Sequence, residues 1–264
     1  MYNACISGDQ MLESYGATDV GKKRQRNEDS YAVLKDINFF IVADGMGGHN
    51  AGDVASATAT KTVEAYMMRS HEEREITWPF GIDPNQSFDA NRLRTSLKMA
   101  NHKVWQLADS NPEYNGMGTT VVCVSVRGDV ATITSVGDSR CYLFHEGKTA
   151  PLTRDDIWLN ETWVRKAFTE EQIQKIPLKN VLSKAVGSKE DIDFPILEQK
   201  LEPGDVLLLC SDGLHGMISE SELHRTLMNY NTDLERLCNT LIQLANEAGG
   251  KDNITVVAIR YVKN

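Results

Sequence analysis

The sequence is poor in cysteine and holds none of the cysteine patterns that carry chemistry. It has five cysteines among 264 residues, an odd count, and no C-x-x-C pair, which argues against a disulfide framework or a cysteine zinc site. No cysteine is followed six positions later by arginine, so a phosphate-binding loop built on a cysteine nucleophile of that spacing is excluded. Cys123, Cys141, Cys210 and Cys238 fall in predicted strands or on a helix face, where we expect small buried hydrophobic side chains.

Long apolar runs and positive charge are also scarce. No run approaches the roughly 18 apolar residues of a membrane span, and the N-terminus lacks the basic and apolar regions of a signal peptide. Lysine and arginine number 28 against 37 acids, for a net charge of −9, which argues against nucleic acid or an anionic membrane as partner. We therefore expect a cytoplasmic protein, with no feature that demands more than a monomer.

The rest of the composition is that of an ordinary globular protein, with 41% hydrophobic and 25% charged residues. No linker-like stretch or internal repeat divides the chain, so we predict a single domain over residues 1–264. Residues 1–14 have no clear pattern and are expected to form a lead-in. Residues 155–178 fit neither sheet nor main helices and are predicted to form a lid insert, helical over 156–176.

Hydrophobic periodicity predicts strands grouped with pairs of helices. Hairpins and a meander, rather than strict alternation of strand and helix, favour an α+β layered fold. The predicted strands are 15–20, 31–34, 39–43, 119–126, 130–136, 140–144, 206–210 and 254–262, and the predicted helices are 51–69, 87–109, one from Ser219 with Glu222, and 233–248. Residues 70–86 are a surface excursion that the sequence does not explain.

The most informative pattern is a lone aspartate at the end of an apolar strand. Asp44 follows five apolar residues and precedes glycine, and Asp212 repeats this arrangement. Asp138 follows a third strand and Asp252 precedes the last. An unpaired buried carboxylate costs several kcal/mol by most estimates, so each requires a partner. Together with Glu28 and Asp29 before the first hairpin strand, they predict hard oxygen ligands for Mg²⁺ or Mn²⁺.

Seven short segments then occur in an order that resembles a known family. They are Arg24-x-x-Asn27-Glu28-Asp29-Ser30, and residues 44–49 (DGMGGH), 118–120 (GTT), 136–140 (VGDSR), 152–155 (LTRD), 211–213 (SDG) and 252–255 (DNIT). This order resembles the metal-dependent protein phosphatases of type 2C, in their compact bacterial form, over about residues 15–262. Each segment alone is a weak signal, but seven at sensible spacing are specific.

The resemblance implies a four-layer α-β-β-α sandwich, two antiparallel sheets flanked by helix pairs, with a binuclear Mg²⁺ or Mn²⁺ site at one edge. It implies that Asp44 bridges the two metals and that the carbonyl of Gly45 joins the second. Asp212 and Asp252 would complete the first metal, and Asp138 with Asp212 matches a third, weaker position.

Further roles follow from the same resemblance. Glu28 would act on the second metal through water, Asp29 would orient metal-bound water, and Arg24 would grip the substrate phosphate. His49 is a candidate general acid, and a structural histidine in a glycine loop is an equal alternative. Thr119 and Thr120 are expected to be structural hydrogen-bonding residues.

The chemistry of a phosphate ester agrees with this set of residues. In-line phosphoryl transfer depends on positioning and electrostatics, two cations can clamp the displacement, and arginine matches two phosphate oxygens. We therefore expect hydrolysis of phosphoserine and phosphothreonine in proteins, reversing a serine/threonine kinase, with phosphorylated proteins as partners.

Two other classes of protein remain as alternatives. A nucleotide-binding loop is disfavoured because G-x-G-x-x-G fails at Asn50 and no G-x-x-x-x-G-K-[ST] occurs. A non-catalytic relative is the stronger rival, although every mapped carboxylate is present. The chain departs from the family pattern after residue 155, where many bacterial members continue with His-Ser and this chain has Asp156 and Ile157. That departure concerns the lid and the third metal position.

Overall fold

The computed structural model describes residues 10–47, 51–72, 76–161, 164, 166, 168–169 and 181–263. The strands are β1 (Gln10–Asp19), β2 (Asp29–Leu34), β3 (Phe39–Met46), β4 (Gly118–Thr119), β5 (Val121–Arg127), β6 (Val130–Val136), β7 (Arg140–His145), β8 (Lys148–Pro151), β9 (Ile196–Lys200), β10 (Val206–Cys210) and β11 (Ile254–Lys263). The helices are α1 (Ala51–Glu72), α2 (Phe88–Ser110), α5 (Asp212–His215), α6 (Glu220–Tyr230) and α7 (Leu234–Glu247).

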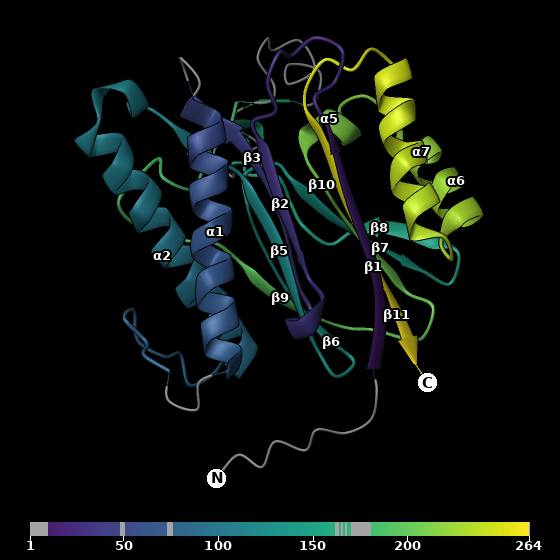
Figure 1. Ribbon diagram of the computed structural model, residues 1–264, viewed down its shortest axis with the longest axis horizontal. Coiled ribbons are helices and arrows are strands. Elements are labelled where there is room, and N and C mark those ends of the chain that lie inside the picture. The colour runs from purple at the N-terminus through teal and green to yellow at the C-terminus, as the bar shows by residue number, and fades with distance from the viewer. Residues whose placement is uncertain are drawn as a thin grey trace.

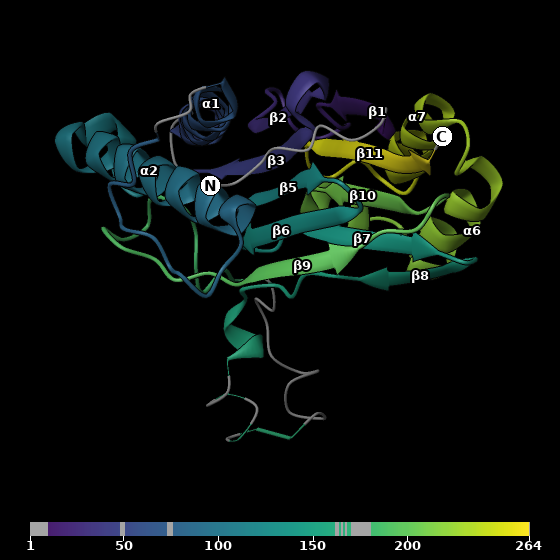
Figure 2. The same cartoon turned by 90° about the horizontal axis from the view of Figure 1, so that it is seen from below.

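The strands form two antiparallel sheets packed face to face (Figures 1 and 2). One has the order β1-β11-β10-β7-β8, and the other has the order β2-β3-β5-β6-β9 with β4 paired to β3. Helices α1 and α2 cover the second sheet, and α6 and α7 cover the first, as Figure 2 shows from below. The predicted α+β four-layer sandwich is confirmed.

Strand β3 shows why the apolar run that precedes Asp44 is continuous. Phe39 and Ile41 pack in the core beneath α1 and α2, whereas Phe40 and Val42 pack in the core between the two sheets. Because alternate side chains of a strand point to opposite faces, a strand with a helix layer on one side and a sheet on the other needs apolar residues at every position. The apolar run seen in the sequence is thus explained by burial of both faces of β3.

Helix caps determine where three of the helices begin. The Oγ of Ser87 accepts the N–H of Ala90 at 3.0 Å at the start of α2. Ser219 and Glu222 form a reciprocal capping box at the start of α6, as the sequence predicts. The Asp233 carboxylate accepts the N–H of Arg236 at 3.0 Å and caps α7.

Two sequence predictions about element boundaries are wrong. The first strand begins at Gln10 rather than Tyr15, because β1 pairs with β11 along its whole length; residues 10–14 therefore belong to the sheet and not to a lead-in. Residues 156–161 are not α-helical, since Ile157 forms a bridge with Leu182 and a short 3-10 turn follows. Most of the remaining lid insert lies outside the described residues.

The cysteine prediction holds for the four cysteines in the described residues, which are free and buried. None of the helices in the described part of the chain has the length and apolar character needed to cross a membrane.

Candidate active site

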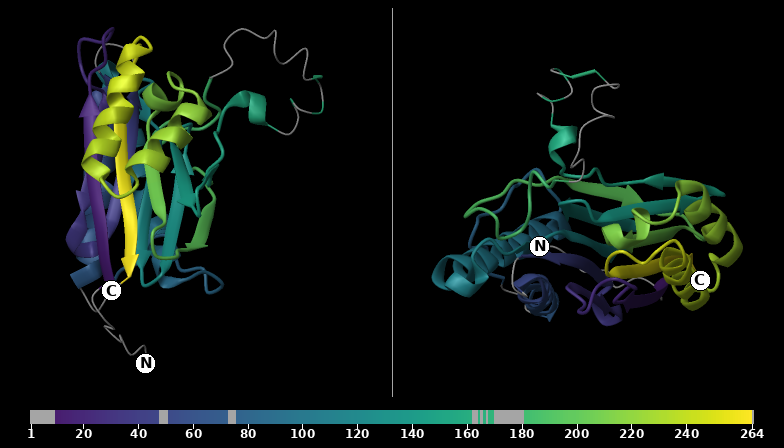
Figure 3. Two further views of the ribbon diagram at one scale, coloured as in Figure 1. Left: turned by 90° about the vertical axis from the view of Figure 1, so that its right-hand side faces the viewer. Right: turned by 90° about the horizontal axis from the view of Figure 1, so that it is seen from above.

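The candidate site lies at one end of the sandwich, where the loop after β1, the end of β3, the β10–α5 junction and the α7–β11 loop meet (Figures 1 and 3). The pairing of β2 with β3 places Asp29 opposite Asp44. Strands β10 and β11 are also antiparallel neighbours, so Asp212 after β10 and Asp252 before β11 leave from the same end. Strand pairing thus brings together acids that are more than 200 positions apart in the chain.

The backbone of Asp44 is held by the two threonines of the 118–120 motif. Its N–H donates to Thr120 Oγ1 at 3.0 Å, and its carbonyl accepts the Thr120 N–H and the Thr119 hydroxyl, both at 2.8 Å. These contacts confirm the structural role predicted for the threonines. Burial raises the pKa of Asp44 well above its ordinary value, and the negative charges of neighbouring acids, Asp29 and Asp212 first, raise it further.

Asp29 and Asp212 each present a buried oxygen atom with no hydrogen-bond partner in the described residues, namely Oδ1 in both. The other oxygen of Asp29, Oδ2, accepts the hydroxyls of Ser211 at 2.8 Å and Thr255 at 2.6 Å. Burial raises the pKa of Asp29 to about 6, although these two hydroxyls lower it. Burial, followed by the charge of Asp252, also raises the pKa of Asp212.

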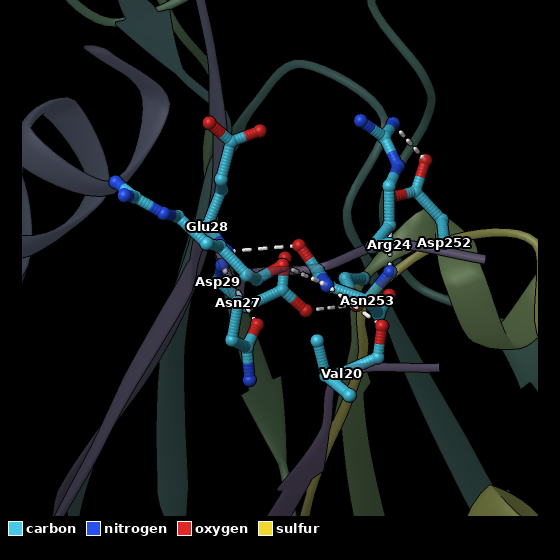
Figure 4. Close-up of polar contacts among 9 residues, drawn as sticks. Val20, Arg24, Asn27, Glu28, Asp29, Asp252 and Asn253 are labelled. Carbon is cyan, nitrogen blue, oxygen red and sulfur yellow. Dashed lines mark hydrogen bonds and ion pairs between the residues drawn. The ribbon is translucent and has the colours of Figure 1, made fainter. Parts of the chain in front are cut away.

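Arg24 places one positive charge beside these acids. Its Nη2 lies 2.7 Å from Oδ2 of Asp252, while 48% of its side chain stays exposed (Figure 4). The hydrogen bond to Asp252 raises the pKa of Arg24. Burial raises the pKa of Glu28 more than the charge of Arg24 lowers it.

Two glycines permit the close backbone approaches that assemble the site. A Cβ on Gly45 would lie 1.9 Å from the carbonyl oxygen of Gly52 at the start of α1, and a Cβ on Gly213 would lie 1.9 Å from the carbonyl oxygen of Asn253. Any side chain at these two positions would separate the segments that carry the acids.

Asn253 joins the loop after β1 to the start of β11, and the sequence reasoning missed its role. Its Nδ2 donates to the carbonyls of Val20 and Arg26, both at 2.9 Å. Its Oδ1 accepts the N–H of Glu28 at 2.8 Å (Figure 4). The side chain is almost completely buried. One amide therefore holds both ends of the loop that carries Arg24, directly beside Asp252.

Asp138 lies next to a second, structural group of charges. It is buried, and burial together with the charges of Asp212 and Asp155 raises its pKa to about 7. Nε2 of His215 donates to the Asp138 carbonyl at 3.0 Å. Arg140 binds Asp155 through two hydrogen bonds of 2.8 and 2.7 Å.

Asp156, where the chain departs from the family pattern, ties the base of the lid insert to the turn before Asp138. The N–H of Asp156 donates to the carbonyl of Gly137 at 2.8 Å, and the carboxylate of Asp156 accepts the N–H of Gly137 at 3.2 Å. Its carbonyl accepts the N–H of Ser183 at 2.8 Å, and Nζ of Lys184 lies 3.6 Å from its Oδ1. A carboxylate here thus connects both stems of the insert with the Asp138 turn.

The predicted general acid, His49, lies outside the described residues, so its role stays a prediction. In the described part of the chain, one group of three possible ligand atoms lies within 4.8 Å of one another: His145, Glu146 and Glu202. This group is at the opposite end of β7 from the site. No three ligand atoms of the strand-end acids in the described residues approach as closely.

The strand-end acids nevertheless fit divalent cations of the hard class. All their donors are oxygen atoms, two buried carboxylate oxygens have no partner in the described residues, and the pKa values of Asp29, Asp44, Asp138 and Asp212 are all raised. Mg²⁺ and Mn²⁺ prefer such oxygen ligands, and their charge would offset the repulsion among the carboxylates.

Comparisons with known proteins agree with this geometry. The sequence profile of the protein phosphatase 2C family matches residues 19–253. The serine/threonine phosphatase stp of Listeria monocytogenes is 34% identical over 250 residues, covering 92% of this chain and 93% of the relative. The crystal structure of the phosphatase Stp1 from Staphylococcus aureus superimposes with a TM-score of 0.80 at 30% identity, covering 100% of both chains.

A third similar protein was solved with metal ions. The catalytic domain of the serine/threonine protein phosphatase PstP, solved with two manganese ions, has a TM-score of 0.77 and 27% identity, covering 96% of this chain and 99% of its own.

The chain belongs to the protein phosphatase 2C family. The sequence prediction of a metal-dependent protein serine/threonine phosphatase is therefore confirmed at the level of the family.

Proposed function

We propose that this chain hydrolyses phosphoserine and phosphothreonine esters in proteins at the strand-end acids, with two Mg²⁺ or Mn²⁺ ions as cofactor and a third, weaker position. The observation that supports this most directly is the pair of buried oxygens on Asp29 and Asp212 that have no hydrogen-bond partner in the described residues. The guanidinium of Arg24, which pairs with Asp252, adds a phosphate-binding group. The two manganese ions of the PstP domain support the number of cations.

Four groups are the proposed direct ligands of the two cations: Asp44, the carbonyl of Gly45, Asp212 and Asp252. Glu28 acts on them through water, and Asp138 with Asp212 would serve the third position. When bound, the cations supply positive charge that stabilises phosphoryl oxygens and makes a water molecule a stronger acid.

The protein's own groups orient the reaction. Asp29, with Oδ2 held by Ser211 and Thr255, presents Oδ1 to orient the attacking water and to accept its proton. The exposed, planar guanidinium of Arg24 binds two phosphate oxygens and holds the ester in line for attack. His49 stays the predicted donor of a proton to the leaving alkoxide.

The proposal is tested by hydrolysis of p-nitrophenyl phosphate and of a phosphothreonine peptide with Mn²⁺ or Mg²⁺. We expect turnover that a chelator abolishes and that returned Mn²⁺ restores. Asp212→Asn, which keeps the size of the side chain, is expected to lower kcat by about a hundredfold or more. The exposed Asp191→Asn is the matched control and is expected to leave kcat unchanged.

Two results would contradict the proposal. Absence of turnover by folded, Mn²⁺-loaded protein would favour the non-catalytic binding module. Turnover that survives both the chelator and Asp212→Asn would place the chemistry elsewhere. Circular dichroism of each variant excludes loss of fold as the cause.

We also infer a cognate serine/threonine kinase, because the proposed substrates exist only after such an enzyme has acted. The single domain over residues 1–264, the monomeric state and the cytoplasmic location stay predictions from the sequence.

A further inference from the structure

A groove of about 580 Å³ lies between α1 and α2 on the face turned away from the sheets. We call it the α1–α2 groove. Tyr66 of α1, Met99 of α2, and Pro79 and Phe80 of the connecting segment give it an apolar lining, and Lys61 and Lys103 lie at its margin. Its volume falls within the range of about 300–1,000 Å³ that is usual for ligand sites. Figure 1 shows the two helices side by side, with their connection at the end away from the candidate active site.

The apolar wall is built by the segment that the sequence analysis left unexplained. The Tyr66 hydroxyl donates to the carbonyl of Thr77 at 3.2 Å. The buried Asn91 exchanges hydrogen bonds of 2.8 and 2.9 Å with the backbone of Asp83. These contacts hold the segment against both helices, yet 40% of Phe80 remains exposed. The segment therefore presents an aromatic ring that the described residues leave partly uncovered.

The charge at the groove is opposite in sign to that of the whole chain. The chain has a net charge of −9, but the described lining residues include lysines and arginine and no carboxylate. Neither Lys61 nor Lys103 lies within 4.0 Å of a carboxylate among the described residues. Burial raises the pKa of Glu64, and the charge of Lys61 offsets part of that rise, but Glu64 does not line the groove. Basic groups around an apolar wall favour a partner with acidic residues around an apolar anchor.

The distance between the α1–α2 groove and the candidate active site determines whether one partner chain can contact both. Helix α1 starts beside Gly45, and Lys61 lies ten positions after Ala51. At about 1.5 Å per residue this is roughly 15 Å along the helix. About five extended residues, at roughly 3.3 Å each, cover this distance, so one chain can reach both places.

We propose that the α1–α2 groove binds an acidic segment with a large apolar anchor, located in the phosphoprotein substrate apart from its phosphorylated residue. The inference rests on the proposed phosphatase function. Binding at the groove raises the effective concentration of the phosphoresidue at the active site without any new contact there. Binding at the groove therefore lowers KM for substrates that carry the acidic segment.

The test uses two phosphothreonine peptides. One carries a tryptophan flanked by aspartates and glutamates about ten residues from the phosphothreonine, and the other has asparagines and glutamines in place of these acids. With the wild-type protein we expect kcat/KM to be about tenfold higher for the acidic peptide, through KM and at low salt only. Both the Lys61→Glu/Lys103→Glu variant and Phe80→Ala are expected to remove this advantage.

A matched control carries the same change of charge on exposed residues elsewhere. Lys148→Glu/Lys200→Glu alters β8 and β9 and is expected to keep the full advantage. Hydrolysis of p-nitrophenyl phosphate is expected to be the same in all of these proteins, because the active site is untouched.

Three outcomes overturn the inference. The first is an equal kcat/KM for the two peptides with wild-type protein. The second is a higher kcat/KM for the acidic peptide that persists in the groove variants. The third is a change of oligomeric state in those variants, measured by sedimentation, which would make the groove an interface between copies of the chain. Failure of the wild-type protein to hydrolyse p-nitrophenyl phosphate would instead overturn the proposed function.

Discussion

At the scale of single residues, the charged side chains of the site depend on a neutral one. Asn253 contacts three backbone groups from two parts of the loop that carries Arg24 and Glu28. Outer contacts of this kind orient metal and phosphate ligands, and their loss typically costs about 10–100-fold in affinity or activity. The amide therefore acts as a positioning residue for the groups that face the substrate.

We predict that Asn253→Ala raises KM for a phosphopeptide by about tenfold and lowers kcat less, because the Arg24 loop is no longer held beside Asp252. The measurement is steady-state kinetics at saturating Mn²⁺. Asn246→Ala is the control, since Asn246 bonds to Asp19 at 3.1 Å and not to that loop. Equal effects of the two variants would show that the loss is one of general stability.

At the scale of secondary-structure elements, a buried ion cluster joins the start of α2 to the end of β5, far from the site. Arg92 is fully buried and donates to Asp89 at 2.9 Å, to Ser70 at 2.8 Å and to the Met67 carbonyl at 2.7 Å. Arg127 also binds both oxygens of Asp89. Burial alone would raise the pKa of Asp89, but the hydrogen bonds and charges of the two arginines lower it.

We predict that Asp89→Ala lowers the free energy of unfolding by about 3–5 kcal/mol, because it leaves the buried Arg92 without its counter-ion. Urea denaturation measures the change. Asp191→Ala breaks an ion pair with Lys98 in which the acid is 75% exposed, and its cost is expected to be about 1 kcal/mol or less. Similar costs for the two substitutions would contradict this account.

The elements that the sequence predicts well are those whose own pattern determines them. Strand β3 is apolar at every position because both of its faces are covered, and α6 carries its capping box in the sequence. The start of β1 was missed because residues 10–14 are held by pairing with β11 rather than by a local pattern. Residues 156–161 have a helix-like composition but bridge to Leu182 instead, a contact that no local pattern reveals.

The residues of the candidate site also differ in how well the sequence predicts them. The acids could be predicted because each stands at the end of a strand, and strand ends meet at a sheet edge. Asn253 and Asp156 could not be assigned a role, since their partners are distant in the chain and are mostly backbone groups. The sequence signal for Asn253 was its place in the Asp252-Asn253 pair before β11. The sequence signal for Asp156 was the departure from the family pattern at that position.

At the scale of the whole molecule, the acids make the metal-free protein sensitive to pH. A carboxyl whose pKa is raised on folding binds its proton more tightly in the folded state than in the unfolded state. The folded state is therefore destabilised as pH rises from the ordinary value near 3.8 through the raised value, which is about 6 for Asp29 and about 7 for Asp138. Bound cations would remove this effect.

We predict that the melting temperature of chelated protein falls as pH rises from about 4 to about 7, and that the stabilisation by Mn²⁺ is larger at the higher pH. Differential scanning calorimetry with and without Mn²⁺ measures both. Asp44→Asn is expected to flatten the decline, whereas Glu247→Gln on the surface of α7 is not. A decline that is the same in both variants would trace the effect to net charge rather than to the site.

The order of strands in the five-stranded sheet has a consequence for synthesis. β11 follows every other strand of that sheet in the chain, yet it lies between β1 and β10. A ribosome that makes the chain from its N-terminus therefore delivers an inner strand after both of its neighbours, and β1 has no partner in the sheet until residues 254–263 emerge. Because Asp252 and Asn253 arrive with that strand, the nascent enzyme cannot assemble its full acid set before the sheet closes.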